Sequence, residues 1–192
     1  TISISVDGTA KARSPQRSYY SLQGPAALQP QGPAFTPGRM DVVLGPVTLP
    51  DSVDRPQIVT RDGENRLAID DLHRWAQPLT GEVAAVLAAS LYRDLGKTTL
   101  VGIQGKETAA SDPLFRVAVD IQRFEAAPGQ SATVEAAWMI RLKGSDAPLR
   151  GLSQAREPAT DSSYDALAKA YARALGRISR EIAAAMGGIR PG

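Results

Sequence analysis

The 192-residue sequence contains no cysteine, a single histidine and few aromatic residues. Without cysteine the chain cannot form a disulfide scaffold, a thiolate zinc site, an iron–sulfur cluster or a cysteine nucleophile. With His73 as the single histidine, the ligands that transition metals favour are nearly missing, so we expect no metal and no cofactor. Aromatic residues make up 5% of the chain, which predicts a core built mainly from aliphatic side chains.

Long hydrophobic runs and a large excess of one charge are also missing. No apolar run approaches the roughly 18 residues that a membrane-spanning helix needs. The formal net charge of +2 is a small surplus and only weak evidence for a polyanion partner, because nucleic-acid binding requires a clustered basic face, so we expect no nucleic-acid partner. A hydrophobic fraction of 43% with 22% charged residues is typical of a globular protein, and the length predicts one domain.

The first part of the chain is predicted to connect rather than to pack. Residues 1–18 are largely polar from Gly8 onward and form a flexible N-terminal tether, whereas residues 19–192 form the folded domain. At the very start of the chain, Ile2, Ile4 and Val6 alternate with polar residues. This pattern indicates either a strand or a segment foreign to the native protein. Four prolines between Gln23 and Gly38 predict an extended surface loop, because each proline fixes φ and removes a backbone donor.

Strands are predicted where apolar residues alternate with polar ones between turn residues. Residues 40–49 form a predicted strand broken at Gly45-Pro46, and residues 57–69 form a hairpin. Three later runs, separated by Pro128-Gly129 and by residues 144–146, predict an antiparallel meander. With two short candidates, the predicted strands are 19–22, 40–49, 57–61, 67–69, 100–103, 115–121, 132–142 and 149–156.

Two helices are predicted from the helical period of their apolar positions. The first covers residues 79–95 and is stopped by Gly96; the second covers about residues 163–186, with Ser163 among its capping candidates. The order of strands, helix, strands and helix lacks a regular β-α-β alternation. The sequence therefore predicts an α/β fold, a single compact domain in which a mixed β-sheet with an antiparallel meander is packed by two main helices.

The sequence holds fragments of two catalytic motifs and neither motif in full. A nucleophile elbow needs Gly-x-Ser-x-Gly between a strand and a helix, whereas Gly151-Leu-Ser153-Gln-Ala155 ends in alanine and lies inside a predicted strand. Gly96-Lys97-Thr98 has the end of a phosphate-binding loop, but Leu91 stands where its first glycine is required. We therefore predict that the protein is not an enzyme.

Two pairs of carboxylates are the remaining candidates for chemistry. Asp51 and Asp54 lie in one predicted loop, and Asp70 and Asp71 are adjacent. Neither pair has the spacing of a calcium loop. Because aspartates in loops usually form turns and caps, we interpret both pairs as structural.

Two blocks of the sequence resemble those of a known family. They read Gly45-Pro-Val-Thr-Leu-Pro50-Asp-Ser-Val-Asp-Arg55-Pro-Gln-Ile-Val-Thr-Arg61 and Arg74-Trp75-Ala-Gln-Pro78-Leu79, and Tyr19-Tyr20-Ser-Leu22 agrees in type and place. Through them the chain resembles the ABC-type transport auxiliary lipoprotein family (PqiC/YmbA type). The resemblance covers nearly the whole domain from Tyr19 onward.

The resemblance implies a location, a partner and a fold. The family's proteins are held in a Gram-negative outer membrane by an acylated N-terminal cysteine, face the periplasm and work beside MCE-domain proteins that move lipid between membranes. The fold implied is similar to the N-terminal domain of TolB. Because the chain has no cysteine, the resemblance places the lipid anchor outside it, in the full-length protein.

Two candidate interaction surfaces follow from residue types. The first, the proline surface, combines stiff loops with residues enriched at interface hot spots: Pro50, Asp54, Arg55, Pro56, Arg74, Trp75 and Pro78. As an alternative, Trp75 caps the core and Arg55 pairs with Asp51 or Asp54. The second, the basic helix face, is either solvated or contacts anionic lipid or an acidic partner, and consists of Lys169, Arg173, Arg177 and Arg180.

The leading functional prediction is a non-catalytic accessory protein of a lipid-trafficking system, acting through protein contacts and self-association as a homo-oligomer. The alternative is a periplasmic module that itself binds a small amphipathic or lipid ligand, in a pocket between the sheet and the helices. A hydrolase is the third and weakest reading, because its base would have to be His73.

Overall fold

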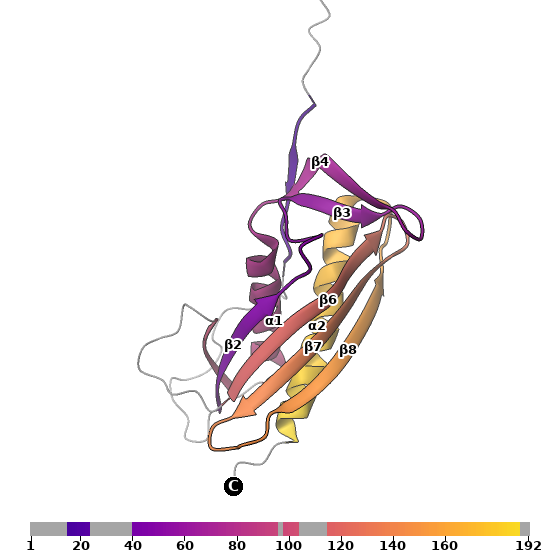
Figure 1. Ribbon diagram of the computed structural model, residues 1–192. Helices are drawn as coiled ribbons and strands as arrows, with labels where there is room; N and C mark the ends of the chain where they lie inside the picture. The colour runs from indigo at the N-terminus through magenta and orange to yellow at the C-terminus, as the bar shows by residue number, and fades with distance from the viewer. Residues whose placement is uncertain (1–14, 24–39, 96–97, 104–114, 189–192) are drawn as a thin grey trace, which may run out of the picture.

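A computed structural model of the chain describes residues 15–23, 40–95, 98–103 and 115–188. In this part, two helices pack on one face of a five-stranded sheet, and a three-stranded sheet lies at one end (Figure 1). The predicted α/β fold with two helices and a meander is confirmed. The strand candidate at Ile2, Ile4 and Val6 and most of the predicted proline loop lie outside the described residues.

The five-stranded sheet has the order β5-β2-β6-β7-β8. The strands β5, β2 and β6 run parallel to one another, while β6, β7 and β8 form the predicted antiparallel meander. The break at Gly45-Pro46 lies within β2, whose register against β6 shifts between Leu44 and Val47. The bounds are β2 Met40–Thr48, β5 Thr98–Ile103, β6 Phe115–Ala127, β7 Ser131–Leu142 and β8 Leu149–Pro158.

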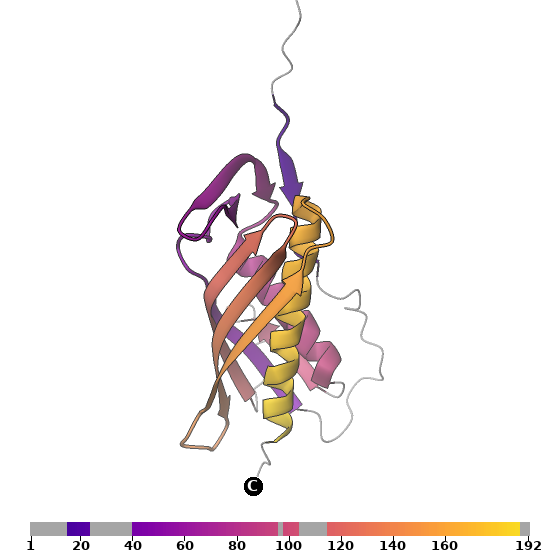
Figure 2. The ribbon, with the colours of Figure 1, turned by 90° about the vertical axis from the view of Figure 1, so that its right-hand side faces the viewer.

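Both helices cover the same face of this sheet (Figure 2). Helix α1 spans Leu79–Leu95 and helix α2 spans Tyr164–Gly187, as the apolar periods predict. At the start of α2, the Ser163 hydroxyl accepts a hydrogen bond from the Ala166 amide at 3.1 Å, which satisfies one of the free donors of the first turn. Within the described part of the chain, neither helix is both long and apolar enough to cross a bilayer.

An aromatic group lies between the sheet and α2. Tyr171 is fully buried and stacks on Phe124 of β6, with ring centroids 3.8 Å apart and an angle of 4° between the rings. Trp75 meets Tyr171 edge-on at 6.4 Å and is only 5% exposed. Of the two interpretations of Trp75, the structure supports the core position, so Trp75 is removed from the proline surface. It is buried because the strand that carries it extends to this position and turns the indole toward α2.

The three-stranded sheet has the order β1-β4-β3, so the predicted single sheet divides into two. Strand β1 (Ser18–Tyr20) runs parallel to β4 (Leu67–Trp75), and β3 (Gln57–Arg61) pairs with β4 to form the predicted hairpin. The sequence places β4 only over residues 67–69, whereas the strand continues to Trp75. Asp70 and Asp71 therefore lie in a strand rather than in a loop.

A buried carboxylate holds the segment that follows β1. The Leu22 amide donates to Glu82 Oε2 of α1 at 2.5 Å, and the backbone oxygen of Tyr20 accepts from the Ala76 amide at 2.7 Å. Glu82 is 7% exposed and its Oε1 atom has no hydrogen-bond partner. Burial raises the pKa of Glu82, and the Leu22 hydrogen bond offsets part of this rise.

Candidate binding surfaces

The fold brings the segments of the proline surface together at the end of β4. The turn after β2 is closed by hydrogen bonds from the amides of Val53 and Asp54 to the Pro50 oxygen, at 3.0 and 3.1 Å. The Trp75 amide then donates to the Pro56 oxygen at 2.7 Å, which fastens this loop to the last residue of β4. Pro78 follows three residues later, directly before α1.

The two arginines of the proline surface have different surroundings. Arg74 is half-buried, and its Nε atom donates to the Asp71 oxygen at 3.1 Å. For Arg55, the described residues include no hydrogen bond or ion pair with Asp51 or Asp54, and its buried Nε atom has no partner. The alternative prediction for Arg55, that it fixes the turn by pairing with one of these aspartates, is therefore wrong.

Much of the charge on the basic helix face is paired within the molecule. Lys169 pairs with Asp165 at 2.6 Å, and both Arg173 and Arg177 reach Glu157 of β8, at 3.3 and 3.2 Å. Arg180 donates from Nε to the Gly176 oxygen at 3.4 Å. The face thus ties α2 to β8, and a partner would have to compete with Glu157 for its arginines.

The two residues considered for acyl transfer are occupied elsewhere. Ser153 is 5% exposed, and its hydroxyl accepts a hydrogen bond from Trp138 Nε1 at 2.9 Å. His73 lies in the other sheet and contacts Asp70 Oδ2 through Nδ1 at 2.8 Å. A nucleophile must touch its base, and these two side chains bind other partners. Within the described ranges, no three potential metal-ligating side chains gather into a site.

A polar cluster that the sequence did not reveal joins β4 to the start of α2. Asp70 Oδ2 accepts from the Tyr164 hydroxyl at 3.0 Å as well as from His73, while Asp70 Oδ1 accepts from the Leu72 amide at 2.8 Å. The His73 and Tyr164 rings stack with centroids 4.2 Å apart, and Tyr20 of β1 lies 5.8 Å from both. Asp70 and Tyr164 are far apart in the chain, so no local spacing signals the cluster.

Ionisation within this cluster follows from its hydrogen bonds. Burial raises the pKa of Asp70, but the three hydrogen bonds to its carboxylate outweigh burial, and the net pKa is lowered. Burial, together with the bond to Asp70, raises the pKa of Tyr164 to about 12. At neutral pH the cluster therefore holds a carboxylate and an intact phenol, which suits a structural clasp between the small sheet and α2.

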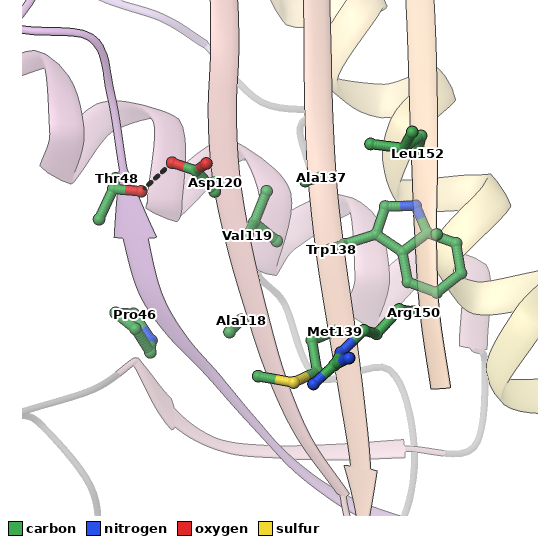
Figure 3. Close-up of a pocket in the computed structure, with 11 residues that line it drawn as sticks. Pro46, Thr48, Ala118, Val119, Asp120, Ala137, Trp138, Met139, Arg150 and Leu152 are labelled. Carbon is green, nitrogen blue, oxygen red and sulfur yellow. Dashed lines mark hydrogen bonds between the residues drawn. The ribbon is translucent and has the colours of Figure 1, made fainter. Parts of the chain in front are cut away.

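The second feature that the sequence missed is a hollow of about 670 Å³ on the outer face of the five-stranded sheet, the face opposite the helices. Figure 3 shows its residues, which come from β2, β6, β7 and β8. The outward-facing side chains alternate with core-facing ones, and Val119, Trp138 and Gly151 are core-facing positions whose backbone borders the hollow. The predicted pocket lay between the sheet and the helices, where the described side chains instead pack as core. The lining consists of Pro46, Thr48, Ala118, Val119, Asp120, Ala137, Trp138, Met139, Arg150, Gly151 and Leu152.

Trp138 faces the core side of β7, and Gly151 leaves room there for its ring. The two residues are Cα partners on β7 and β8, and a Cβ atom at Gly151 would lie 2.1 Å from Cζ2 of the indole. The indole therefore lies directly against the β8 backbone, and its Nε1 atom is held by Ser153. The sequence signal that was available is the glycine itself, since a glycine inside a strand marks a close approach.

Comparisons with known proteins agree with these sequence blocks and this fold. The sequence model of the family described as "ABC-type transport auxiliary lipoprotein component" matches residues 20–183. A crystal structure of a protein described as uncharacterized has a TM-score of 0.70 at 18% identity, covering 89% of this chain and 99% of that chain. Protein XCC0632 from Xanthomonas campestris, of the DUF330 family, has a TM-score of 0.64 at 18% identity, covering 86% and 92%. No curated protein matches the chain.

Proposed function

The chain belongs to the family of ABC-type transport auxiliary lipoproteins, and from this premise we propose that it is a non-catalytic accessory component of an MCE-type lipid-trafficking system, acting through protein contacts. In the full-length protein, an acylated N-terminal cysteine anchors the domain to the outer membrane, with the domain facing the periplasm. The observation that carries this proposal is the family match over residues 20–183, which spans nearly the whole described fold.

The proline surface supports docking of a partner by its rigidity. Its loop is fixed by hydrogen bonds from Val53, Asp54 and Trp75, so ordering on binding costs little conformational entropy. Arg55 offers a guanidinium whose buried Nε has no partner within the chain. Arginine is enriched at interface hot spots, and a carboxylate or backbone oxygen of an MCE-domain protein would satisfy this donor.

The experiment is co-purification of the full-length lipidated protein from envelope membranes after mild cross-linking. We expect Arg55→Glu and Arg74→Glu each to reduce the recovered MCE-domain protein at least tenfold, because both variants place a negative charge in the docking surface. The matched control is Arg66→Glu, since Arg66 is exposed in the hairpin turn and pairs only with Asp62. Unchanged recovery with both test variants would refute the proline surface as the docking site.

Self-association is tested on the same variants by light scattering. A homo-oligomer built through the proline surface should lose mass in Arg55→Glu and keep it in Arg66→Glu, since a symmetric assembly repeats one patch in every subunit. Circular dichroism of each variant shows whether the fold is intact. An oligomer that survives both charge reversals on the proline surface would place the subunit interface elsewhere.

The alternative function is a periplasmic binding module for a small amphipathic or lipid ligand. The hollow on the outer face of the five-stranded sheet favours it. Native mass spectrometry from mild detergent separates the two functions, because a binding module retains lipid at unit stoichiometry and a pure docking protein does not.

A further inference from the structure

The outer-face hollow combines an apolar floor with an open entrance. Ala118, Ala137 and Met139 supply apolar surface from the two central strands, and Leu152 of β8 is 77% exposed beside them. Because the exposed Leu152 adjoins a concave apolar surface, covering both by an apolar group would remove apolar area from water. Its volume of about 670 Å³ lies within the roughly 300–1,000 Å³ typical of small-molecule sites.

Charge on this face of the sheet is distributed unevenly along the strands. Beyond one end of the hollow, Arg61 and Arg123 are paired with Glu125, and Arg123 also contacts Glu135 at 3.1 Å. Arg61 and Arg123 are therefore neutralised within the molecule, and Arg156 at the same end donates to the Ser131 hydroxyl.

At the other end, two arginines have no such partner. Arg150 is the Cα partner of Met139, and Arg141 occupies the next position of β7 on the same face. Both are exposed, and neither makes a hydrogen bond or ion pair with any residue of the described chain. In Figure 3, Arg150 extends from β8 to lie beside Met139, at the edge of the apolar floor.

A carboxylate lies across the hollow from these arginines. Asp120 of β6 accepts a hydrogen bond from the Thr48 hydroxyl at 2.5 Å, which fixes it on the rim formed by β2 and β6 (Figure 3). The hollow thus has an anionic rim on one side and free guanidinium groups on the other. A ligand with one negative charge is drawn to Arg150 and Arg141 and repelled from Asp120, which sets a single orientation.

We propose that this hollow binds a single-chain amphiphile with an anionic head group, whose apolar chain lies against Met139 and Leu152 while the head group pairs with Arg150 and Arg141. A guanidinium binds a carboxylate or phosphate through two parallel hydrogen bonds. The chain covers the apolar floor, including the exposed side chain of Leu152. The inference rests on the hollow alone and not on the proline surface, so either can fail without the other.

The test places a fluorescent reporter at the hollow. The two natural tryptophans face the core, because Trp138 Nε1 donates to the buried Ser153 hydroxyl and Trp75 is itself buried. A third tryptophan, introduced by Gln154→Trp, lies on the outer face of β8 next to Leu152. Dibrominated stearate, added below the concentration at which it forms micelles, quenches an indole at short range. We expect saturable quenching of Gln154→Trp well beyond any quenching in the wild-type protein. Equal quenching of the two proteins would overturn the proposed site.

Affinity is measured separately by calorimetry, with variants of the floor and of the charged end. We expect Leu152→Asp and Arg150→Glu each to weaken binding at least tenfold, and the uncharged methyl ester to bind at least tenfold more weakly than the acid. The matched control is Arg156→Glu, on the same face of β8 but outside the hollow, which should bind like the wild type. Leu152 and Arg150 are exposed, so circular dichroism should show intact folding in both variants.

Three results would refute the proposal. Wild-type affinity in both Leu152→Asp and Arg150→Glu would show that the amphiphile binds elsewhere. Equal affinity for the acid and the methyl ester would show that the arginines do not bind the head group. A concentration-dependent increase in mass that Leu152→Asp abolishes, without stearate binding, would identify a second copy of the chain as the occupant.

Discussion

Replacing Gly151 by alanine tests the packing of Trp138 against the backbone of β8. The added Cβ would lie 2.1 Å from Trp138 Cζ2 and 2.5 Å from Cε2 and Cη2. Carbon atoms rest at roughly 3.5–4.0 Å, so the indole must move by on the order of 1.5 Å. Such a movement breaks the 2.9 Å hydrogen bond from Nε1 to Ser153, because the hydroxyl is fixed on the buried side of β8.

The expected loss of stability is about 2–3 kcal/mol. The broken hydrogen bond contributes about 0.5–1.5 kcal/mol, and forcing extra volume into a packed site costs about 1–3 kcal/mol. The alanine recovers about 0.4–1 kcal/mol by restricting the unfolded chain. For a chain of this size, the net loss corresponds to a decrease in the midpoint of thermal unfolding of about 4–12 °C.

The assay is urea unfolding followed by far-ultraviolet circular dichroism, because the fluorescence of Trp138 itself changes with the substitution. Gly187→Ala is the matched control: its added Cβ meets no atom within 4 Å, so we expect a change below about 0.5 kcal/mol. In a Trp138→Ala background, Gly151→Ala should become nearly neutral. A cost below 0.5 kcal/mol in the wild-type background, or an equal cost with and without the indole, would refute the reasoning.

Three further outcomes are expected. Asp70→Asn should lower the free energy of unfolding by about 1–2 kcal/mol at pH 7. The pKa of Asp70 is lower in the folded protein than in the unfolded chain, so this difference between variant and wild type should be constant above the unfolded pKa of roughly 3.9. It should shrink as the pH falls through the folded pKa. The hydrogen bond from Arg61 is the main cause of the lowered pKa of Glu125. Glu125→Gln should therefore lower the free energy of unfolding, measured in urea, by about 1–3 kcal/mol at pH 7 and leave it unchanged in acid. An equal loss of stability at low pH would exclude the ion pair as the cause. Deleting residues 1–14 should leave the thermal midpoint within about 2 °C of the full chain, because a tether buries little surface, and a larger decrease would indicate a packed strand there.

The local pattern of the sequence predicts the elements but not their long-range pairing. The helical period and the caps locate α1 and α2, since these signals act within a few residues. The parallel pairing of Ser18–Tyr20 with the end of β4 joins segments about fifty residues apart, and no local pattern encodes it. The division of the strands between two sheets, and with it the burial of Trp75, therefore emerged only in three dimensions.

The candidate sites show the same limit. Alternation along β7 predicts that Ala137 and Met139 share a face, yet it does not say which face the helices cover. The hollow exists because both helices pack on the other face and leave this one open. The clasp of Asp70 with Tyr164 likewise depends on where α2 begins relative to β4. Residue types alone favoured the prolines and arginines near Trp75, and whether they form an interface stays a prediction.

The attachment of β1 has a mechanical consequence. Tension transmitted through the residues before Ser18 pulls along β1, whose backbone hydrogen bonds to β4 run across the direction of pull. Such a strand is loaded in shear, so its bonds share the force and must fail together, whereas a hairpin pulled from one end opens one bond at a time. The hydrogen bond from the Leu22 amide to Glu82 adds a further attachment directly after the strand. Tension applied through this segment would therefore load β1 and the Leu22–Glu82 hydrogen bond before it reaches the helices.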